Sequence, residues 1–137
     1  MQFLLMELGS GVYAVDSAAV REIVPTCSAT RLPGAPPHVR GVMNLRGRLV
    51  TVVDLTRRLT GEGVRNAEGS TIVVQSGERV LGLSVDEVRD VQSLEVSGPE
   101  GLAYDQARHG LIRGLGRLGD EVVIVLDVDE IVRQTLV

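Results

Sequence analysis

The chain has 137 residues, of which 44% are hydrophobic and 23% charged, and its formal net charge at pH 7 is −4. This is the length of one domain with a single core, and the composition excludes a chain that is disordered throughout. All cationic residues are arginine and they are scattered, while the aromatic residues are only one Phe and two Tyr. An RNA-binding barrel is therefore disfavoured, because it needs a basic surface and stacking aromatics.

The cysteine content and the hydropathy pattern predict a cytoplasmic protein. Cys27 is the single cysteine, so no internal disulfide can form. The apolar stretch near the start covers only Phe3–Met6 before Glu7 and has no basic leader, so we expect neither a signal peptide nor an anchor. No apolar run approaches the roughly 20 residues that span a bilayer.

Two β-hairpins are predicted, one in each half of the chain. Apolar-rich segments at 3–8 and 12–16 flank the turn sequence GSG, and segments at 71–75 and 79–85 flank SGE. Short strands on either side of glycine-containing turns are typical of hairpins. The core is built from Val, Leu and Ile, which also favour β structure.

Two longer apolar runs are predicted to be central strands, each followed by a short helix. The runs Leu49–Val53 and Val122–Leu126 are apolar on both strand faces, so we expect both faces to be covered. Asp54 can cap a helix over LTRRL, and either Asp127 or Asp129 can cap a helix over EIVRQTLV.

The order of these elements occurs twice. GSGVYAVDSAAVREI (9–23) aligns with GERVLGLSVDEVRDV (77–91), and Arg40-Gly41 aligns with Arg113-Gly114 further along. This repeat and the many short strands predict an all-β domain over 1–137 that contains two small barrels. We expect the first barrel mainly at 10–70 and the second mainly at 71–125, with exchange of terminal elements between them allowed.

No residue pattern indicates catalysis, a metal site or a cofactor. His38 and His109 lie in loops of opposite halves without a companion at ligand spacing, and Cys27 has no histidine near it in sequence. The adjacent carboxylates Asp86 and Glu87 are expected on opposite faces of a strand, whereas acid–base catalysis needs two that converge. We therefore expect no enzyme activity.

The turn sequence NLRG differs between the two copies of the repeat. Arg46 stands where the second copy has Gly119, and Glu22 upstream is a plausible partner for its guanidinium. Such a pair at the rim of a barrel would form a recognition surface. The alternative is that Asn44 and Gly47 only shape a turn while Arg46 is solvated, and the sequence leaves both open.

The segments quoted above resemble the CheW family of bacterial chemotaxis coupling proteins. The most specific match is VRGVMNLRGRLVTVVDL, which is similar to the family's Asn-Leu-Arg-Gly turn followed by an apolar strand that ends in Asp-Leu. YAVDSAAVREIV, GLSVDEVRDV and GLIRGLGRLGDEVVIVLDVDEIV resemble the family's other motifs in the same order. The chain departs from the pattern at Thr51, where the family usually has proline, and in its shorter termini.

The resemblance implies two SH3-like five-stranded barrels with short helices after the last strands. It also implies a non-catalytic adaptor that connects chemoreceptor cytoplasmic tips to the regulatory domain of the CheA histidine kinase, without nucleic acid, cofactor or membrane insertion. For the kinase it implies only exposed barrel ends, without particular residues. By position, the receptor-binding residues would be Val20, Glu22, Asn44, Leu45, Arg46, Val88 and Val91.

Two other functions remain open at this point. One is a CheW-like module of another receptor array, or of a larger CheA- or CheV-type protein, although the elements at both ends and the starting methionine favour a stand-alone adaptor. The other is a small-barrel ligand-binding protein. A deep polar pocket that holds Glu22, Asp90 and a histidine together would favour the ligand-binding protein, whereas a shallow apolar groove would not.

Overall fold

The computed structural model describes residues 1–25, 29–61, 69–98 and 110–136, most of which lie in β-strands. Two short helices, one single-turn 3₁₀ helix and eleven strands are described in these ranges. In chain order the elements are β1 (Gln2–Leu8), β2 (Gly11–Asp16), η1 (Ser17–Ala19), β3 (Val20–Pro25), β4 (Val39–Leu45), β5 (Arg48–Asp54), α1 (Leu55–Thr60), β6 (Ser70–Ser76), β7 (Arg79–Val85), β8 (Glu87–Ser93), β9 (Val96–Ser97), β10 (Ile112–Leu118), β11 (Glu121–Leu126) and α3 (Val128–Thr135).

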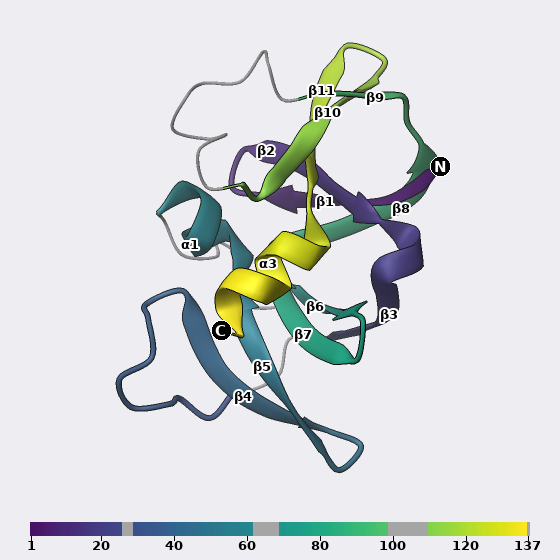
Figure 1. The fold of residues 1–137 in the computed structure, drawn as a ribbon. Helices are drawn as coiled ribbons and strands as arrows, with labels where there is room; N and C mark the ends of the chain where they lie inside the picture. The colour runs from purple at the N-terminus through teal and green to yellow at the C-terminus, as the bar shows by residue number, and fades with distance from the viewer. Residues whose placement is uncertain (26–28, 62–68, 99–109, 137) are drawn as a thin grey trace.

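The strands form two sheets, each of which curls into a small barrel (Figure 1). The first barrel is the five-stranded sheet β3-β6-β7-β5-β4, and the second barrel is the six-stranded sheet β8-β1-β2-β11-β10-β9. The second sheet has a sixth member because the short β9, just after β8, pairs with β10. In the first barrel the equivalent of the β9–β10 pairing is a single β-bridge between Thr30 and Val42. The predicted all-β fold with two barrels is confirmed.

Each barrel receives its hairpin from the opposite copy of the repeat. The β6–β7 hairpin joins β3, β4 and β5, while the β1–β2 hairpin joins β8 to β11. Each hairpin pairs in parallel on one side, β7 with β5 and β2 with β11, and antiparallel on the other, β6 with β3 and β1 with β8. The first barrel thus spans residues 20–85, and the second combines 2–16 with 87–126. This differs from the expected division at residues 70 and 71, because local sequence does not reveal which distant strand a hairpin joins.

The repeated Arg-Gly pair marks the same close approach in both barrels. A Cβ built on Gly41 would lie 2.0 Å from the carbonyl oxygen of Thr30, and one on Gly114 would lie 2.0 Å from that of Ser97. The strand register shifts beside both glycines. In each barrel a neighbouring segment, the one around Thr30 in the first barrel and β9 in the second, passes so close to the strand that a side chain at this position would clash with its backbone. This explains why glycine occurs at both positions.

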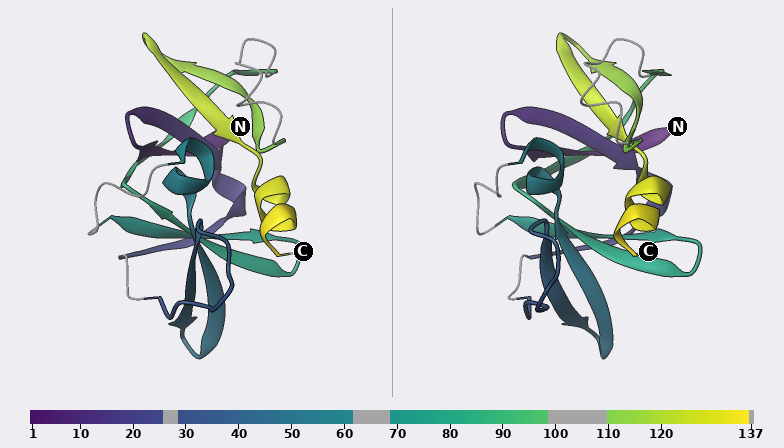
Figure 2. Two further views of the ribbon diagram at one scale, coloured as in Figure 1. Left: turned by 90° about the vertical axis from the view of Figure 1, so that its left-hand side faces the viewer. Right: turned by 60° about the vertical axis from the view of Figure 1, so that its left-hand side comes forward.

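The largest apolar cluster lies between the barrels and joins them. Both views of Figure 2 show α3 at the level where the barrels meet, and α3 packs on β6 and β7. Alternate residues of β1 face different interiors: Leu4 and Met6 face the shared cluster, whereas Phe3 and Leu5 face the inside of the second barrel. The shared cluster consists of Leu4, Met6, Leu8, Tyr13, Val15, Val53, Leu55, Ile72, Val74, Leu81, Leu83, Val85, Leu111, Ile112, Leu126, Val128, Ile131 and Val132.

The two long apolar strands are interior members of their sheets, as predicted, but they are not buried throughout. Val52 is 4% exposed and Val53 is fully buried, on opposite faces of β5. Leu49 and Val122, near the starts of β5 and β11, are 72% and 55% exposed. The expectation of complete two-sided burial was wrong at these positions, because each strand begins at the rim of its barrel, where no second layer covers it.

Aspartate caps begin both helices, as predicted. The Asp54 carboxylate accepts a hydrogen bond from the Arg57 backbone N–H at 3.0 Å, and Asp127 does the same for Glu130 at 3.1 Å. Asp127 is therefore the cap, and Asp129 lies in the first turn of α3. Within the described ranges, no helix has the length and apolar character needed to cross a membrane.

Candidate partner-binding site

The β4–β5 turn holds Arg46 in an uncommon backbone conformation. Arg46 has φ of 52° and Gly47 has φ of 83°, the pattern of a tight two-residue hairpin turn. The Asn44 side-chain oxygen accepts a hydrogen bond from the Gly47 N–H at 2.8 Å and holds this shape. Arg46 is the one non-glycine residue with positive φ in the described part of the chain. Positive φ in a residue with a Cβ costs free energy, so the turn by itself favours glycine over arginine at this position.

The Arg46 side chain contacts the first barrel's edge strand. Its guanidinium donates a hydrogen bond to the Glu22 carboxylate at 2.8 Å, and the two side chains are 77% and 24% exposed. Glu22 lies on β3, directly after a register shift in its pairing with β6. The predicted proximity of Arg46 and Glu22 is confirmed.

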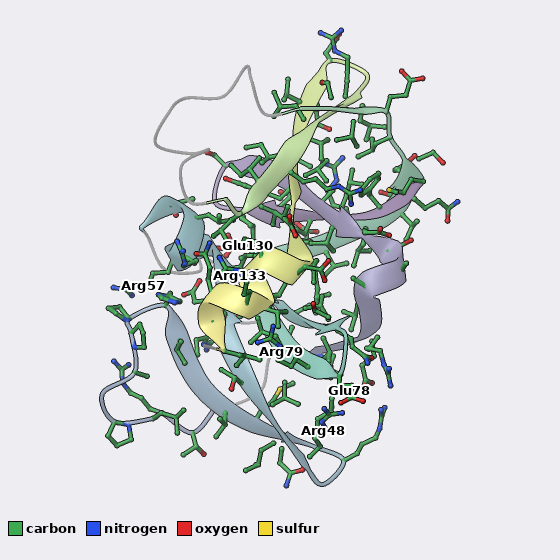
Figure 3. All side chains as sticks on the ribbon, in the orientation of Figure 1. Arg48, Arg57, Glu78, Arg79, Glu130 and Arg133 are labelled. Atoms are coloured by element: carbon green, nitrogen blue, oxygen red, sulfur yellow. The ribbon has the colours of Figure 1, made fainter. Side chains whose placement is uncertain are left out.

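A hollow of about 230 Å³ opens beside this ion pair at the mouth of the first barrel. Valine and leucine side chains form its apolar part, and three arginines and one glutamate surround them. Figure 3 labels one of these arginines, Arg48, at the start of β5. The arrangement suits a partner that offers both an apolar side chain and polar or acidic groups. The lining residues are Arg21, Glu22, Leu45, Arg46, Arg48, Val50, Val73 and Val80.

The second barrel lacks the same arrangement. Asp90, the counterpart of Glu22 in the repeat, accepts a hydrogen bond from the Gln92 amide at 2.6 Å, and Gly119 offers no side chain in place of Arg46. The guanidinium of Arg89 instead lies 3.3 Å from the Glu121 carboxylate. The ion pair between the turn arginine and the edge-strand glutamate is therefore specific to the first barrel and is not a general consequence of the fold.

The remaining residues expected to bind the receptor lie outside the lining of the hollow. Val20 on β3 and Val88 on β8 are partly buried and pack against the shared cluster, while Val91 on β8 is 47% exposed. β3 and β8 occupy equivalent edge positions in the two sheets. Of the seven residues, the hollow brings together Glu22, Leu45 and Arg46, and Asn44 shapes the turn behind them.

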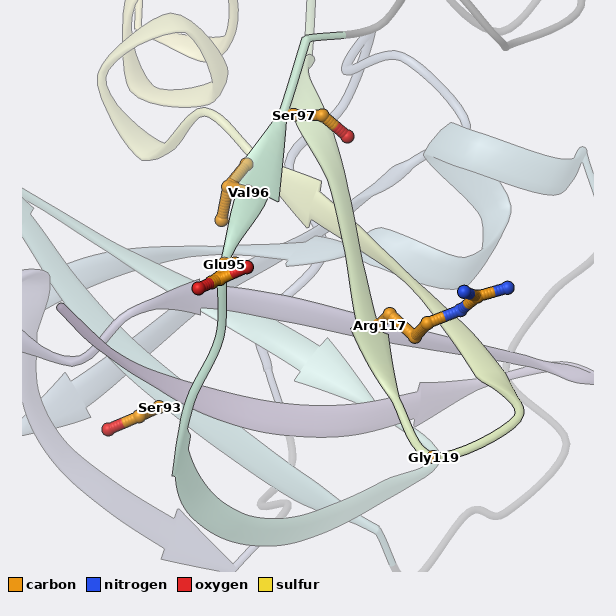
Figure 4. A pocket seen from close by; sticks show the side chains of 6 residues that line it. All are labelled: Ser93, Glu95, Val96, Ser97, Arg117 and Gly119. Carbon is orange, nitrogen blue, oxygen red and sulfur yellow. The ribbon is translucent and has the colours of Figure 1, made fainter.

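Each barrel also presents an exposed apolar side chain at its rim. Leu49 and Val122 are the second residues of β5 and β11 and are equivalent in the repeat. Beside Val122 lies a hollow of about 300 Å³, which adjoins a larger one of about 610 Å³ around Glu95, Val96 and Arg117 (Figure 4). These barrel ends are open surfaces suited to protein contact.

Among the described residues, the side chains that could take part in catalysis or metal binding are not assembled into a site. Glu22, Asp90 and His38 lie apart: Glu22 at the first barrel's mouth, Asp90 on β8, and His38 in a hollow beside α1. His109 and Cys27 lie outside the described residues. Within the described ranges, no group of three or more His, Cys, Asp or Glu side chains is placed to hold a metal ion.

The sequence matches the family profile of the CheW-like domain over residues 2–136. The chain belongs to the CheW-like domain family. A chemotaxis protein CheW from Klebsiella aerogenes is 36% identical over 135 residues, covering 95% of this chain and 80% of that protein. One from Rhizobium meliloti is 31% identical over 137 residues, covering 95% of this chain and 86% of the relative.

The fold agrees with this assignment. The crystal structure of the scaffolding protein TtCheW from Thermoanaerobacter tengcongensis superimposes with a TM-score of 0.83 at 26% identity, covering 93% of this chain and 88% of that one. The two-barrel fold and the scaffold family are thus established for this chain.

The sequence did not predict the whole lining of the hollow beside the Arg46–Glu22 ion pair. Val73 and Val80 come from the β6–β7 hairpin, which the sequence placed in the other barrel. Arg21 precedes Glu22 and holds the Gln75 side chain, also on β6. The only available signal was the Val-Arg-Glu-Ile motif itself, since a single sequence does not show which hairpin closes the barrel behind it.

Proposed function

We propose that this CheW-like chain is a non-catalytic adaptor that couples the cytoplasmic tips of chemoreceptors to the regulatory domain of a CheA-type histidine kinase. Family membership supports the scaffold role. The observation that carries the receptor-binding part is Arg46, held at positive φ and paired with Glu22 above a partly apolar hollow. A strained arginine that the fold does not need is best explained by a partner.

The proposed receptor surface extends from this hollow along the two edge strands. Glu22, Leu45 and Arg46 form its centre, and Asn44 sets the turn. Val20 forms its β3 side, and Val88 and Val91 its β8 side. A helical receptor tip with apolar side chains on one face and polar groups beside them would match this composition.

The proposed kinase surface is the exposed barrel ends. Leu49 and Val122 are exposed at equivalent rims, and each is paired across its hairpin with a polar or charged residue, Asn44 and Arg117 respectively. An exposed apolar centre with a polar rim is the usual arrangement of a transient protein interface. Two equivalent ends would allow the adaptor to contact a partner on each side, and alternation along β5 directs Leu49 to the opposite face from Arg48 and Val50, which line the receptor hollow. A protein with this proposed function would act in the cytoplasm, at membrane-associated receptor arrays.

The direct experiment measures the two bindings separately. The chain is titrated with a receptor signalling fragment and with the regulatory domain of a CheA-type kinase, and a pull-down from native cytoplasm identifies the natural partners. We expect both to bind, with Arg46→Ala weakening receptor binding alone, and Leu49→Asp or Val122→Asp weakening kinase binding alone. Recovery of neither partner contradicts the proposal.

The absence of catalysis has its own test. His38→Ala, His109→Ala and Cys27→Ala should each leave receptor–kinase coupling intact, because the sequence pattern of these residues indicates no nucleophile, base or metal-ligand set. Loss of coupling in one of these variants, with folding unchanged, would count against an adaptor without chemistry.

A further inference from the structure

A second charged hollow lies away from the proposed receptor surface. It has a volume of about 480 Å³ and is lined by Pro37, His38, Arg57, Arg58, Gly61 and Gln134. These residues come from the loop before β4, from α1 and its end, and from α3. Figure 3 shows Arg57 beside the loop that leads into β4. The hollow therefore lies where elements of the first barrel meet the C-terminal helix.

The ionisable side chains that line this hollow are all basic; the Glu130 carboxylate, which is not part of the lining, accepts a hydrogen bond from the Gln134 amide at 2.9 Å. The lining contains two arginines and a histidine, and no carboxylate among the described residues. Arg58 is held in place because its guanidinium donates a hydrogen bond to the Gln134 side-chain oxygen at 2.8 Å. His38 is held through its backbone oxygen, which accepts a hydrogen bond from the Asp54 N–H at 2.7 Å. Burial, together with the nearby Arg58, lowers the pKa of His38. A bound anion would offset the repulsion between Arg58 and a protonated His38.

The repeat shows that the fold does not require these charges. The backbone oxygen of Leu111 accepts the hydrogen bond from Asp127 that His38 accepts from Asp54, so His38 and Leu111 are equivalent. By the same helix alignment, Arg57 corresponds to Glu130 and Arg58 to Ile131. Leu111 and Ile131 are each 1% exposed in the shared core. The second barrel thus has buried apolar side chains in place of His38 and Arg58, and a carboxylate, Glu130, in place of Arg57.

We propose that this hollow, hereafter the cationic hollow, binds the phosphate group of a small phosphorylated molecule. Two guanidiniums and an imidazole supply the donors that a doubly charged oxyanion uses, and Pro37 supplies an apolar wall for an organic substituent. Arg57 is exposed and free to turn toward the ligand, whereas Arg58 is already fixed. The site is separate from the receptor hollow and does not depend on the proposed coupling function.

The test titrates the full chain with inorganic phosphate and with glycerol 3-phosphate, at ionic strength matched with chloride. NMR follows the His38 imidazole and the backbone amides around Gly61. We expect saturable shifts confined to the cationic hollow, and a rise in the pKa of His38 on binding, because an opposite charge favours imidazolium. Arg57→Gln should weaken phosphate binding about tenfold or more, the usual effect of removing a charged hydrogen-bond donor.

Three comparisons make the result decisive. Arg79→Gln, a matched loss of one exposed arginine on β7, should leave phosphate affinity unchanged. His38→Gln should weaken binding without altering receptor or kinase affinity, which separates this site from the coupling function. Acetate that binds as tightly as phosphate, shifts that do not saturate, or equal affinity in Arg57→Gln would each overturn the proposal. The two arginines would then serve only the C-terminal end of α1.

Discussion

Arg46 and Gly119 occupy the same place in the two barrels. Each is the first residue of the two-residue turn that joins two antiparallel strands, with φ of 52° and 61°. At such a position glycine is free of strain, whereas a residue with a Cβ costs roughly 1 kcal/mol. The first barrel thus keeps a residue that its own turn disfavours, and that residue contacts Glu22.

Arg46→Gly should stabilise the fold while it weakens receptor binding. Relief of the left-handed strain predicts a gain of about 1 kcal/mol in the free energy of unfolding, less the small value of an exposed ion pair. Receptor affinity should fall, because the guanidinium is gone. Gly119→Ala is the matched control, since it introduces a Cβ at the equivalent φ and should destabilise the fold by about the same amount. Denaturant unfolding and receptor titration measure both; a variant less stable than wild type refutes the strain argument.

Arg46→Ala and Glu22→Ala remove the ion pair but, unlike Arg46→Gly, introduce no glycine that would relieve the backbone strain at residue 46. They therefore test whether the pair serves folding or binding. The exposed pair contributes only about 0–1 kcal/mol to folding, so both variants should melt close to wild type. Binding to receptor signalling fragments should weaken by roughly 2 kcal/mol or more for Arg46→Ala, because a fixed guanidinium is lost from the centre of an interface. Equal loss of stability and affinity would make Arg46 a structural residue, and no loss of either would make it a solvated one.

Val52→Asp and Leu49→Asp test the depth of burial along one strand. Val52 is 4% exposed and lies inside the first barrel, so an aspartate there should cost several kcal/mol, the order of magnitude for an unpaired buried charge. Leu49 is 72% exposed, so the same substitution three residues earlier should change the free energy of unfolding by less than about 1 kcal/mol. Similar melting temperatures for the two variants would mean that the order of strands in the barrel is wrong.

The sequence alone was sufficient to predict the local elements of structure and the internal repeat. Both hairpins and both aspartate caps depend on residues close together in the chain, and the structure has them where the pattern placed them. The alignment of Arg46 with Gly119 even led to the Glu22 contact. These features could be predicted because turn chemistry and strand periodicity are properties of short segments.

The sequence could not predict which strands each hairpin pairs with. The parallel pairs β5–β7 and β11–β2 join segments far apart in the chain, and the apolar faces of β1 and β6 fit either barrel equally well by pattern. For the same reason, sequence placed Val73 and Val80 away from the hollow that they line. The exposure of Leu49 was missed because hydropathy does not show where a strand leaves the barrel rim.

Gly41→Ala and Gly114→Ala test the closure of each barrel. A Cβ at either position would lie 2.0 Å from a backbone carbonyl oxygen, so the neighbouring segment would have to move. We expect each variant to lose about 2 kcal/mol or more of unfolding free energy. Gly61→Ala is a control with positive φ but open space around the Cβ, and its cost should be limited to about 1 kcal/mol of backbone strain. A cost at Gly41 or Gly114 no larger than that at Gly61 would show that the close approach relaxes freely.

His38 should make stability depend on pH in the acidic range. Burial first, and then the nearby Arg58, lowers the pKa of His38 in the folded chain. The unfolded chain therefore binds the proton more tightly, so stability present above the ordinary histidine pKa is lost as pH falls toward the folded pKa. His38→Gln removes this pH-dependent contribution to stability. The free energy of unfolding of the variant should therefore decline less than that of wild type between about pH 7.5 and 5.5. His38→Leu, which introduces the side chain found at the equivalent Leu111, should show the same reduced decline; an unchanged pH dependence in both variants would mean that His38 titrates alike in the folded and unfolded chains.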